Sequence, residues 1–271
     1  PVPKAGLVPF DINAPLFSDY AQKDRFIFLP EGGTMTYRED GPFELPVGAA
    51  LVKSFSYPAD FRDASKGRRL IETRLLIHTP AGWQGAAYVW NEDYSDARLK
   101  VAGATVPVNW IDAQGVPRRT DYLVPNMNQC KYCHRGFGET APLGLIARQV
   151  NRLASANAEH WVAGSSEVQR KPVASTPPNQ LDLWSSLGIL TGAPESADAP
   201  RVSVWDDPAT GTIEQRALTY LDANCAHCHN DRGLAGPTLL NFTLDEALVN
   251  RPGIYHRPTA AGNASRGRRF A

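Results

Sequence analysis

The sequence holds little sulfur and no long hydrophobic run. Its 271 residues include four cysteines and two methionines, and all four cysteines lie in the motifs described below, so none is left over for a disulfide. None of the apolar runs approaches the ~20 residues that a membrane-spanning helix needs. Lysine plus arginine and aspartate plus glutamate both total 28, and this lack of net charge argues against nucleic acid as the main partner. The chain opens on Pro1 without an initiator methionine, and we interpret it as a mature or trimmed product whose export signal has gone.

Short β-like segments dominate the first half of the chain. Residues 1–24 carry four prolines, which keep regular elements short there. Alternating apolar segments of strand length then follow at 26–28, 51–55, 70–78, 86–90 and 106–111. Glycine-containing turns separate several of these segments. This pattern predicts an N-terminal antiparallel β domain, built as a sandwich or in a barrel-like manner.

Helical patterns prevail in the second half of the chain. Residues 143–150 are predicted as one helix and residues 180–187 as another. Thr212 and Gln215 have the spacing of a capping box, which predicts a helix over residues 213–224. The predicted fold class is therefore α+β, with mainly helical segments after the β domain.

This pattern divides the chain into four parts. The β domain covers residues 1–124, and a first helical segment covers 125–190. Residues 191–211 are rich in proline, glycine, serine and alanine, which is typical of a linker. A small second domain follows over 212–271.

The cysteines form two Cys-x-x-Cys-His blocks, at residues 130–134 and 225–229. This spacing is typical of covalent haem attachment, because two nearby thiols can each form a thioether with one vinyl group while the adjacent histidine binds the iron. We therefore expect two covalently bound haem c groups. The predicted attachment residues are Cys130, Cys133, Cys225 and Cys228, and the predicted axial iron ligands are His134 and His229.

Two other kinds of site use paired cysteines. Four thiolates could hold a structural zinc ion, but the two pairs lie far apart in the sequence and zinc requires no histidine after each pair. A thioredoxin-like redox pair is expected beside a βαβ unit, which neither block has. Haem attachment therefore explains the pattern better than either alternative.

The two blocks are followed by similar residues. Gly138 and Gly233 each lie four residues after the block histidine, and Pro142 and Pro237 each lie eight residues after it. A proline keeps its carbonyl, which could accept the proton on the second nitrogen of the axial histidine and so define its tautomer. We predict this role for Pro142 and Pro237, although a proline that opens a helix or turn is also common.

The sixth iron ligands are less defined by the sequence. A second axial ligand separates electron transfer from small-molecule chemistry. His160 is the candidate for the first haem. No methionine follows His229, so the second haem could use His256, a ligand from another chain, or a residue beyond a trimmed C-terminus, and we prefer the last interpretation.

Five further blocks are distinctive together. They lie at residues 15–20, 41–48, 72–76, 88–91 and 128–134. With these blocks the chain resembles an uncharacterised family of bacterial dihaem c-type cytochromes, and its second haem segment resembles the small class I cytochrome c domain. The resemblance implies an exported electron carrier with an N-terminal β domain and assigns no substrate. Members of the family usually continue into a methionine-containing end, which this chain lacks.

The expected function is therefore electron transfer outside the cytoplasm, in the periplasm or at the cell surface. Expected partners are a weakly docked redox protein or other cytochrome chains. The alternative is a dihaem peroxidase-like oxidoreductase in which one haem iron stays five-coordinate. A third possibility is a binding module whose β domain recognises a ligand while the haems relay electrons.

Overall fold

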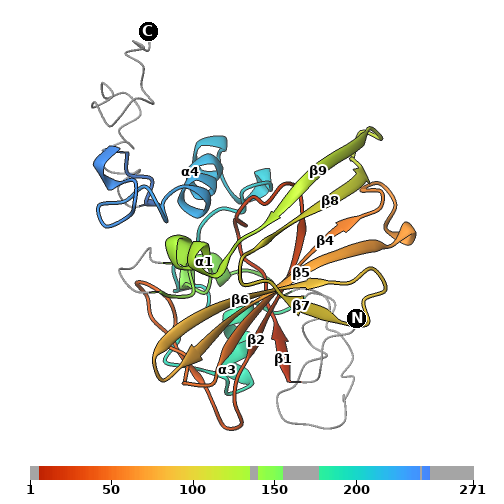
Figure 1. Ribbon diagram of the computed structural model, residues 1–271. Helices are drawn as coiled ribbons and strands as arrows, with labels where there is room; N and C mark the ends of the chain where they lie inside the picture. Colours follow the sequence, from red (N-terminus) through yellow and green to blue (C-terminus); the bar gives the residue numbers. More distant parts are fainter. Residues whose placement is uncertain (1–5, 135–139, 155–176, 239, 245–271) are drawn as a thin grey trace.

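The computed structural model describes residues 6–134, 140–154, 177–238 and 240–244 (Figure 1). Its largest element is a six-stranded antiparallel sheet with the strand order β1-β2-β4-β5-β6-β7. The strands are β1 (Leu7–Pro9), β2 (Gln22–Phe28), β4 (Ala50–Pro58), β5 (Arg68–Thr79), β6 (Gly82–Trp90) and β7 (Ala97–Leu99). The predicted N-terminal antiparallel β domain is thus confirmed.

A hairpin forms a second layer over one end of this sheet. It consists of β8 (Ala104–Ile111) and β9 (Pro117–Val124), whose side chains alternate between buried and exposed along much of their length. The buried residues of the hairpin, which include Val108 and Tyr122, pack against Phe55 and Ala87 of the sheet. This apolar contact explains the period-2 pattern of the hairpin, because only one of its faces is removed from water.

The face of the sheet that carries Ile27 and Phe55 is here called the inner face. Residues directly opposite each other on neighbouring antiparallel strands point to the same side, and the register therefore defines three rows on this face. The rows are Val8–Ile27–Leu51–Leu76–Gly85, then Arg25–Lys53–Arg74–Ala87, then Lys23–Phe55–Glu72–Val89. The first row is largely apolar and the second carries three cations.

The chain that follows the β domain covers the rest of the inner face. The short helices α2 (Ala147–Val150) and α3 (Gln180–Ser186) belong to one buried cluster with Ile27 and Val8. Trp184 of α3 is fully buried there. The parallel pair β3 (Met35–Thr36) and β10 (Leu190–Thr191) closes this cluster. The helix predicted over 180–187 is confirmed.

The helix predicted over residues 143–150 is wrong in its first half. Only Ala147–Val150 is helical. The backbone of Leu145 instead accepts a hydrogen bond from the Phe43 amide, and Ile146 forms a β-bridge with Pro42. Tertiary pairing with a distant segment has therefore overridden a local helical pattern.

The segments after the β domain, which were predicted to be mainly helical, are not so in their described parts. They hold α1 (Met127–His134), α2, α3 and α4 (Ile213–Asn224), with irregular chain between them. The capping box that opens α4 is confirmed, because the Thr212 side chain accepts from the Gln215 amide and the Gln215 side chain accepts from the Thr212 amide. No helix in the described ranges is long and apolar enough to cross a membrane.

The segment predicted as a linker, residues 191–211, is packed against the body of the protein. Ala199 and Val202 within it are buried. The side-chain amide of Asn151 donates to the carbonyls of Ser196 and Ala199, at 2.9 and 3.0 Å. These contacts fasten the segment to the chain beside α2.

Candidate functional site

The first Cys-x-x-Cys-His block lies in α1, directly after β9. A reciprocal cap opens this helix. The Gln129 side chain accepts a hydrogen bond from the Asn126 amide at 2.8 Å, and the Asn126 side chain accepts one from the Gln129 amide at 2.9 Å. This Asn-x-x-Gln spacing is a signal in the sequence for the start of a helix. The helix packs on β6, and a Cβ atom at Gly85 of that strand would lie 3.0 Å from the Cys130 Cβ and 3.3 Å from its sulfur.

The His134 ring is held by the chain that follows the helix. Its Nδ1 lies 2.8 Å from the Ala141 carbonyl oxygen, to which it can only donate, because a carbonyl has no proton. The Ala141 amide in turn donates to the His134 carbonyl. The ring therefore carries its proton on Nδ1 and leaves Nε2 as the nitrogen with a free lone pair. The predicted acceptor was the carbonyl of Pro142, and the structure gives this role to the preceding residue.

Burial lowers the pKa of His134 to about 4, and the positive charges of Lys53 and Arg74 act in the same direction. The hydrogen bond to the Ala141 carbonyl opposes these effects. The ring is consequently neutral at physiological pH, which is the state in which imidazole binds a metal.

The second block follows the last turn of α4 without interruption. The amides of Cys228 and His229 both donate to the Cys225 carbonyl, at 3.1 and 2.8 Å. The turn after the block is so tight that a Cβ atom at Gly233 would overlap the Cys228 carbonyl oxygen. Glycine is therefore required there by close backbone approach.

The His229 ring has a hydroxyl as its neighbour. Its Nδ1 lies 3.3 Å from Oγ1 of Thr238, and the same hydroxyl donates its proton to the Ala235 carbonyl at 2.6 Å. Because a hydroxyl has one proton to give, it must accept from the ring, so His229 also carries its proton on Nδ1. The predicted acceptor was the carbonyl of Pro237, and the structure gives the role to the residue after it.

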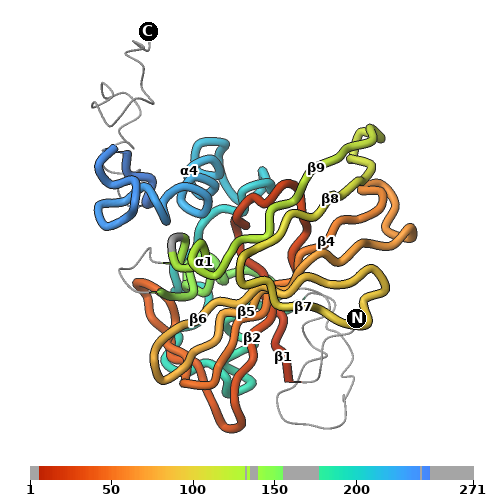
Figure 2. Tube along the Cα trace, in the orientation of Figure 1, coloured from red at the N-terminus to blue at the C-terminus, as the bar shows by residue number. Residues whose placement is uncertain are grey.

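The fold brings the two blocks next to each other. Burial raises the pKa of Cys228, and the nearby Cys133 contributes to this shift to a smaller extent. The charge on His227 likewise contributes to lowering the pKa of His134. The tube trace shows α1 close to the chain that follows α4 (Figure 2).

Polar contacts fasten α4 to the rest of the molecule. Arg148 donates to both carboxylate oxygens of Asp222, at 3.3 and 3.2 Å, and the Asp222 side chain is only 6% exposed. The Asn224 side chain accepts from the Phe17 amide at 2.6 Å and donates to the Pro15 carbonyl at 3.3 Å. The second block is thereby attached both to α2 and to the N-terminal lead-in.

The four cysteines are free thiols, each partly exposed. Within the described part of the chain, which includes all four, no three His, Cys, Asp or Glu side chains are grouped so as to hold a metal ion. The thiols are therefore not arranged as a four-cysteine zinc site.

The proposed sixth ligands His160 and His256 lie outside the described residues. Two further residues of types that can bind iron, Met35 and His78, are engaged elsewhere. Met35 is fully buried in the core, and His78 stacks on Trp83 with its Nδ1 2.9 Å from the Leu45 carbonyl oxygen.

Comparison of the chain with models of known protein families gave no match. Comparisons with curated proteins and with solved structures gave none either.

Proposed function

We propose that the protein is a dihaem c-type cytochrome that transfers electrons outside the cytoplasm. The observation that carries the proposal is shared by both blocks. In each, a pair of free thiols precedes a histidine whose Nδ1 proton is engaged by the protein. Each histidine therefore has Nε2 available for iron beside two thiols available for thioethers.

Corresponding residues of the two blocks would have the same roles. Cys130 and Cys133 would hold one haem, and Cys225 and Cys228 the other. When bound, each haem supplies an iron centre that accepts and releases one electron. The hydrogen bonds at His134 and His229 fix the orientation of the two imidazole rings and make Nε2 more basic.

The closeness of the two Cys-x-x-Cys-His blocks supports electron exchange between the two sites. Cys133 and Cys228 lie close enough for one to influence the pKa of the other, which supports a short distance between the two sites. The ion pair between Arg148 and Asp222 joins α2, which follows the first block, to α4, which precedes the second block. A redox protein that docks weakly over a small surface, or another cytochrome chain, would deliver or remove the electron.

A haem count on the purified chain tests this proposal. A pyridine haemochrome assay should give two haems per chain for the unaltered protein. The double variants Cys130→Ala/Cys133→Ala and Cys225→Ala/Cys228→Ala should each retain one haem. Fewer than two haems in the unaltered protein would contradict the proposal.

Spectroscopy separates this function from the peroxidase-like alternative. An electron carrier should keep both irons low-spin, and its spectrum should not change when cyanide or peroxide is added. A high-spin signal that shifts on cyanide addition would instead indicate an open haem and favour the oxidoreductase.

A further inference from the structure

A row of cations crosses the inner face of the sheet beside the first block. Arg25, Lys53 and Arg74 lie directly opposite one another on β2, β4 and β5. Neighbouring strands are about 4.8 Å apart, so the row extends over roughly 10 Å. Lys23 lies in the adjacent row, opposite Phe55. These four residues are here called the cation row.

The cation row has fewer carboxylates than positive charges. Arg74 pairs with the buried Glu72, which also accepts from the Tyr122 hydroxyl at 2.6 Å. Arg25 lies 3.4 Å from Asp11. Within the described ranges, Lys53 and Lys23 have no carboxylate at ion-pair distance; the only hydrogen bond of the Lys23 ammonium there goes to a backbone carbonyl.

Three of the cations gather around one aromatic ring. The Phe55 ring centroid lies 4.3 Å from the Arg74 guanidinium carbon, 5.4 Å from the Lys53 nitrogen and 5.8 Å from the Lys23 nitrogen. Cation–π contacts offset only part of the repulsion among like charges. Burial and the neighbouring cations lower the pKa of Lys53 to about 7 and that of Lys23 to about 8. An anion placed against the row would offset the cost of burying these like charges.

The cation row starts at the first block and ends at an open cavity. Arg74 lies directly opposite Ala87 of β6, and Gly85, on the same face of that strand, is in contact with Cys130. At the other end, Lys23 and Arg25 line a cavity of about 330 Å³. The other lining residues are Pro15, Ala21, Gln22 and Asp24.

We propose that the cation row is a carboxylate site, and that the two propionates of the haem on Cys130 and Cys133 occupy it. This inference rests on the proposed function. A haem bound through its vinyl groups carries its propionates on the opposite edge of the ring. The row fits that chemistry, because it begins beside the Cys130 thiol and leads away from it, and because two of its four cations, Lys53 and Lys23, have no carboxylate at ion-pair distance within the described residues. Lysine and arginine are the side chains that pair with carboxylates most strongly.

Lys53→Met tests the site, because methionine keeps the length of the side chain and removes its charge. A nearby positive charge favours the reduced iron, so a redox titration should show a lower midpoint potential for the first haem and an unchanged one for the second. Lys53→Arg should restore the potential. Arg119→Met, which removes an exposed cation from β9, is the control and should change neither potential.

Two results would overturn the inference. Unchanged potentials in Lys53→Met, with both haems attached, would show that the cation row does not act on the first haem. A saturable binding of citrate to the intact protein by calorimetry, abolished by Lys53→Met, would show that the row takes a free carboxylate instead of the propionates. Fewer than two haems in the unaltered protein would be a separate failure, that of the proposed function.

Discussion

Gly85 and Cys130 lie in direct contact, although one belongs to the middle of a strand and the other to the first Cys-x-x-Cys-His block. The space for a side chain at Gly85 is occupied by the Cys130 Cβ and sulfur, 3.0 and 3.3 Å from where a Cβ would stand. Glycine normally weakens a strand, and it occurs where another segment approaches closely. Here that segment is α1, and the contact determines how deeply the first thiol sits against the sheet.

Gly85→Val should therefore push α1 away from β6. Valine favours strands more than glycine does, so a loss of stability would arise from the contact and not from the strand itself. Overpacking of this kind costs about 1–3 kcal/mol, and we expect a lower urea midpoint and less haem on the first block. Ala86→Val, on the opposite face of the same strand, is the control. Full haem loading with an unchanged midpoint would show that the contact does not matter.

Asp222→Ala should loosen the attachment of the second block. The carboxylate accepts from Arg148 and also from the Leu244 amide at 3.1 Å. Loss of hydrogen bonds to a buried charged group costs about 1–3 kcal/mol, which a denaturant titration can measure. We also expect slower electron exchange between the haems in flash-reduction kinetics. Asp206→Ala removes an exposed carboxylate from the preceding loop, and a similar loss in that control would refute the specific role of Asp222.

Thr238→Val should raise the reduction potential of the second haem alone. Valine has nearly the shape of threonine but cannot accept the Nδ1 proton of His229. The imidazole then donates less electron density to the iron, and the oxidised state loses stabilisation. Thr238→Ser keeps the hydroxyl and should keep the potential. A redox titration in which Val and Ser variants behave alike would contradict this assignment.

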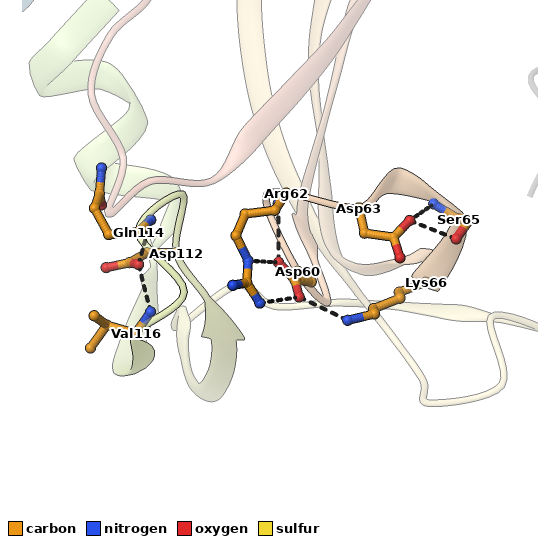
Figure 3. Close-up of polar contacts among 8 residues, drawn as sticks. All are labelled: Asp60, Arg62, Asp63, Ser65, Lys66, Asp112, Gln114 and Val116. Carbon is orange, nitrogen blue, oxygen red and sulfur yellow. Dashed lines mark hydrogen bonds and ion pairs between the residues drawn. The ribbon is translucent and has the colours of Figure 1, made fainter.

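The stability of the β domain should fall in acid through Asp60. This buried carboxylate accepts from the Arg62 side chain at 2.9 Å and from the Lys66 ammonium at 2.9 Å (Figure 3). These hydrogen bonds hold the pKa of Asp60 well below its usual range. In the unfolded chain the group protonates near pH 4, so its contribution is complete above that pH and is lost as the pH falls toward the lower folded pKa.

Urea midpoints measured between pH 2 and 7 would test this dependence. Asp60→Asn should lower the midpoint at neutral pH and flatten its decline below about pH 4. Asp40→Asn, which alters an exposed carboxylate, should leave the profile as it is. An equally steep acid decline in Asp60→Asn would place the pH dependence elsewhere.

Local features were predictable because they depend on neighbours in the sequence. The strands over 51–55 and 70–78 follow from period-2 alternation, and the start of α4 follows from Thr212 and Gln215 three residues apart. The extended path of Leu145 was not predictable in this way. It depends on pairing with Phe43, a hundred residues earlier in the chain.

The site shows the same division. The two Cys-x-x-Cys-His blocks could be recognised from the sequence, because the spacing typical of haem attachment lies within five consecutive residues. Only the tertiary structure decided which atoms hold the His134 and His229 rings, that Gly85 makes room for Cys130, and that three cations form one row across β2, β4 and β5. These relationships arise from strand register and from how distant segments pack. Alternation along a strand specifies which face of the sheet each side chain is on, but not which strand pairs with it.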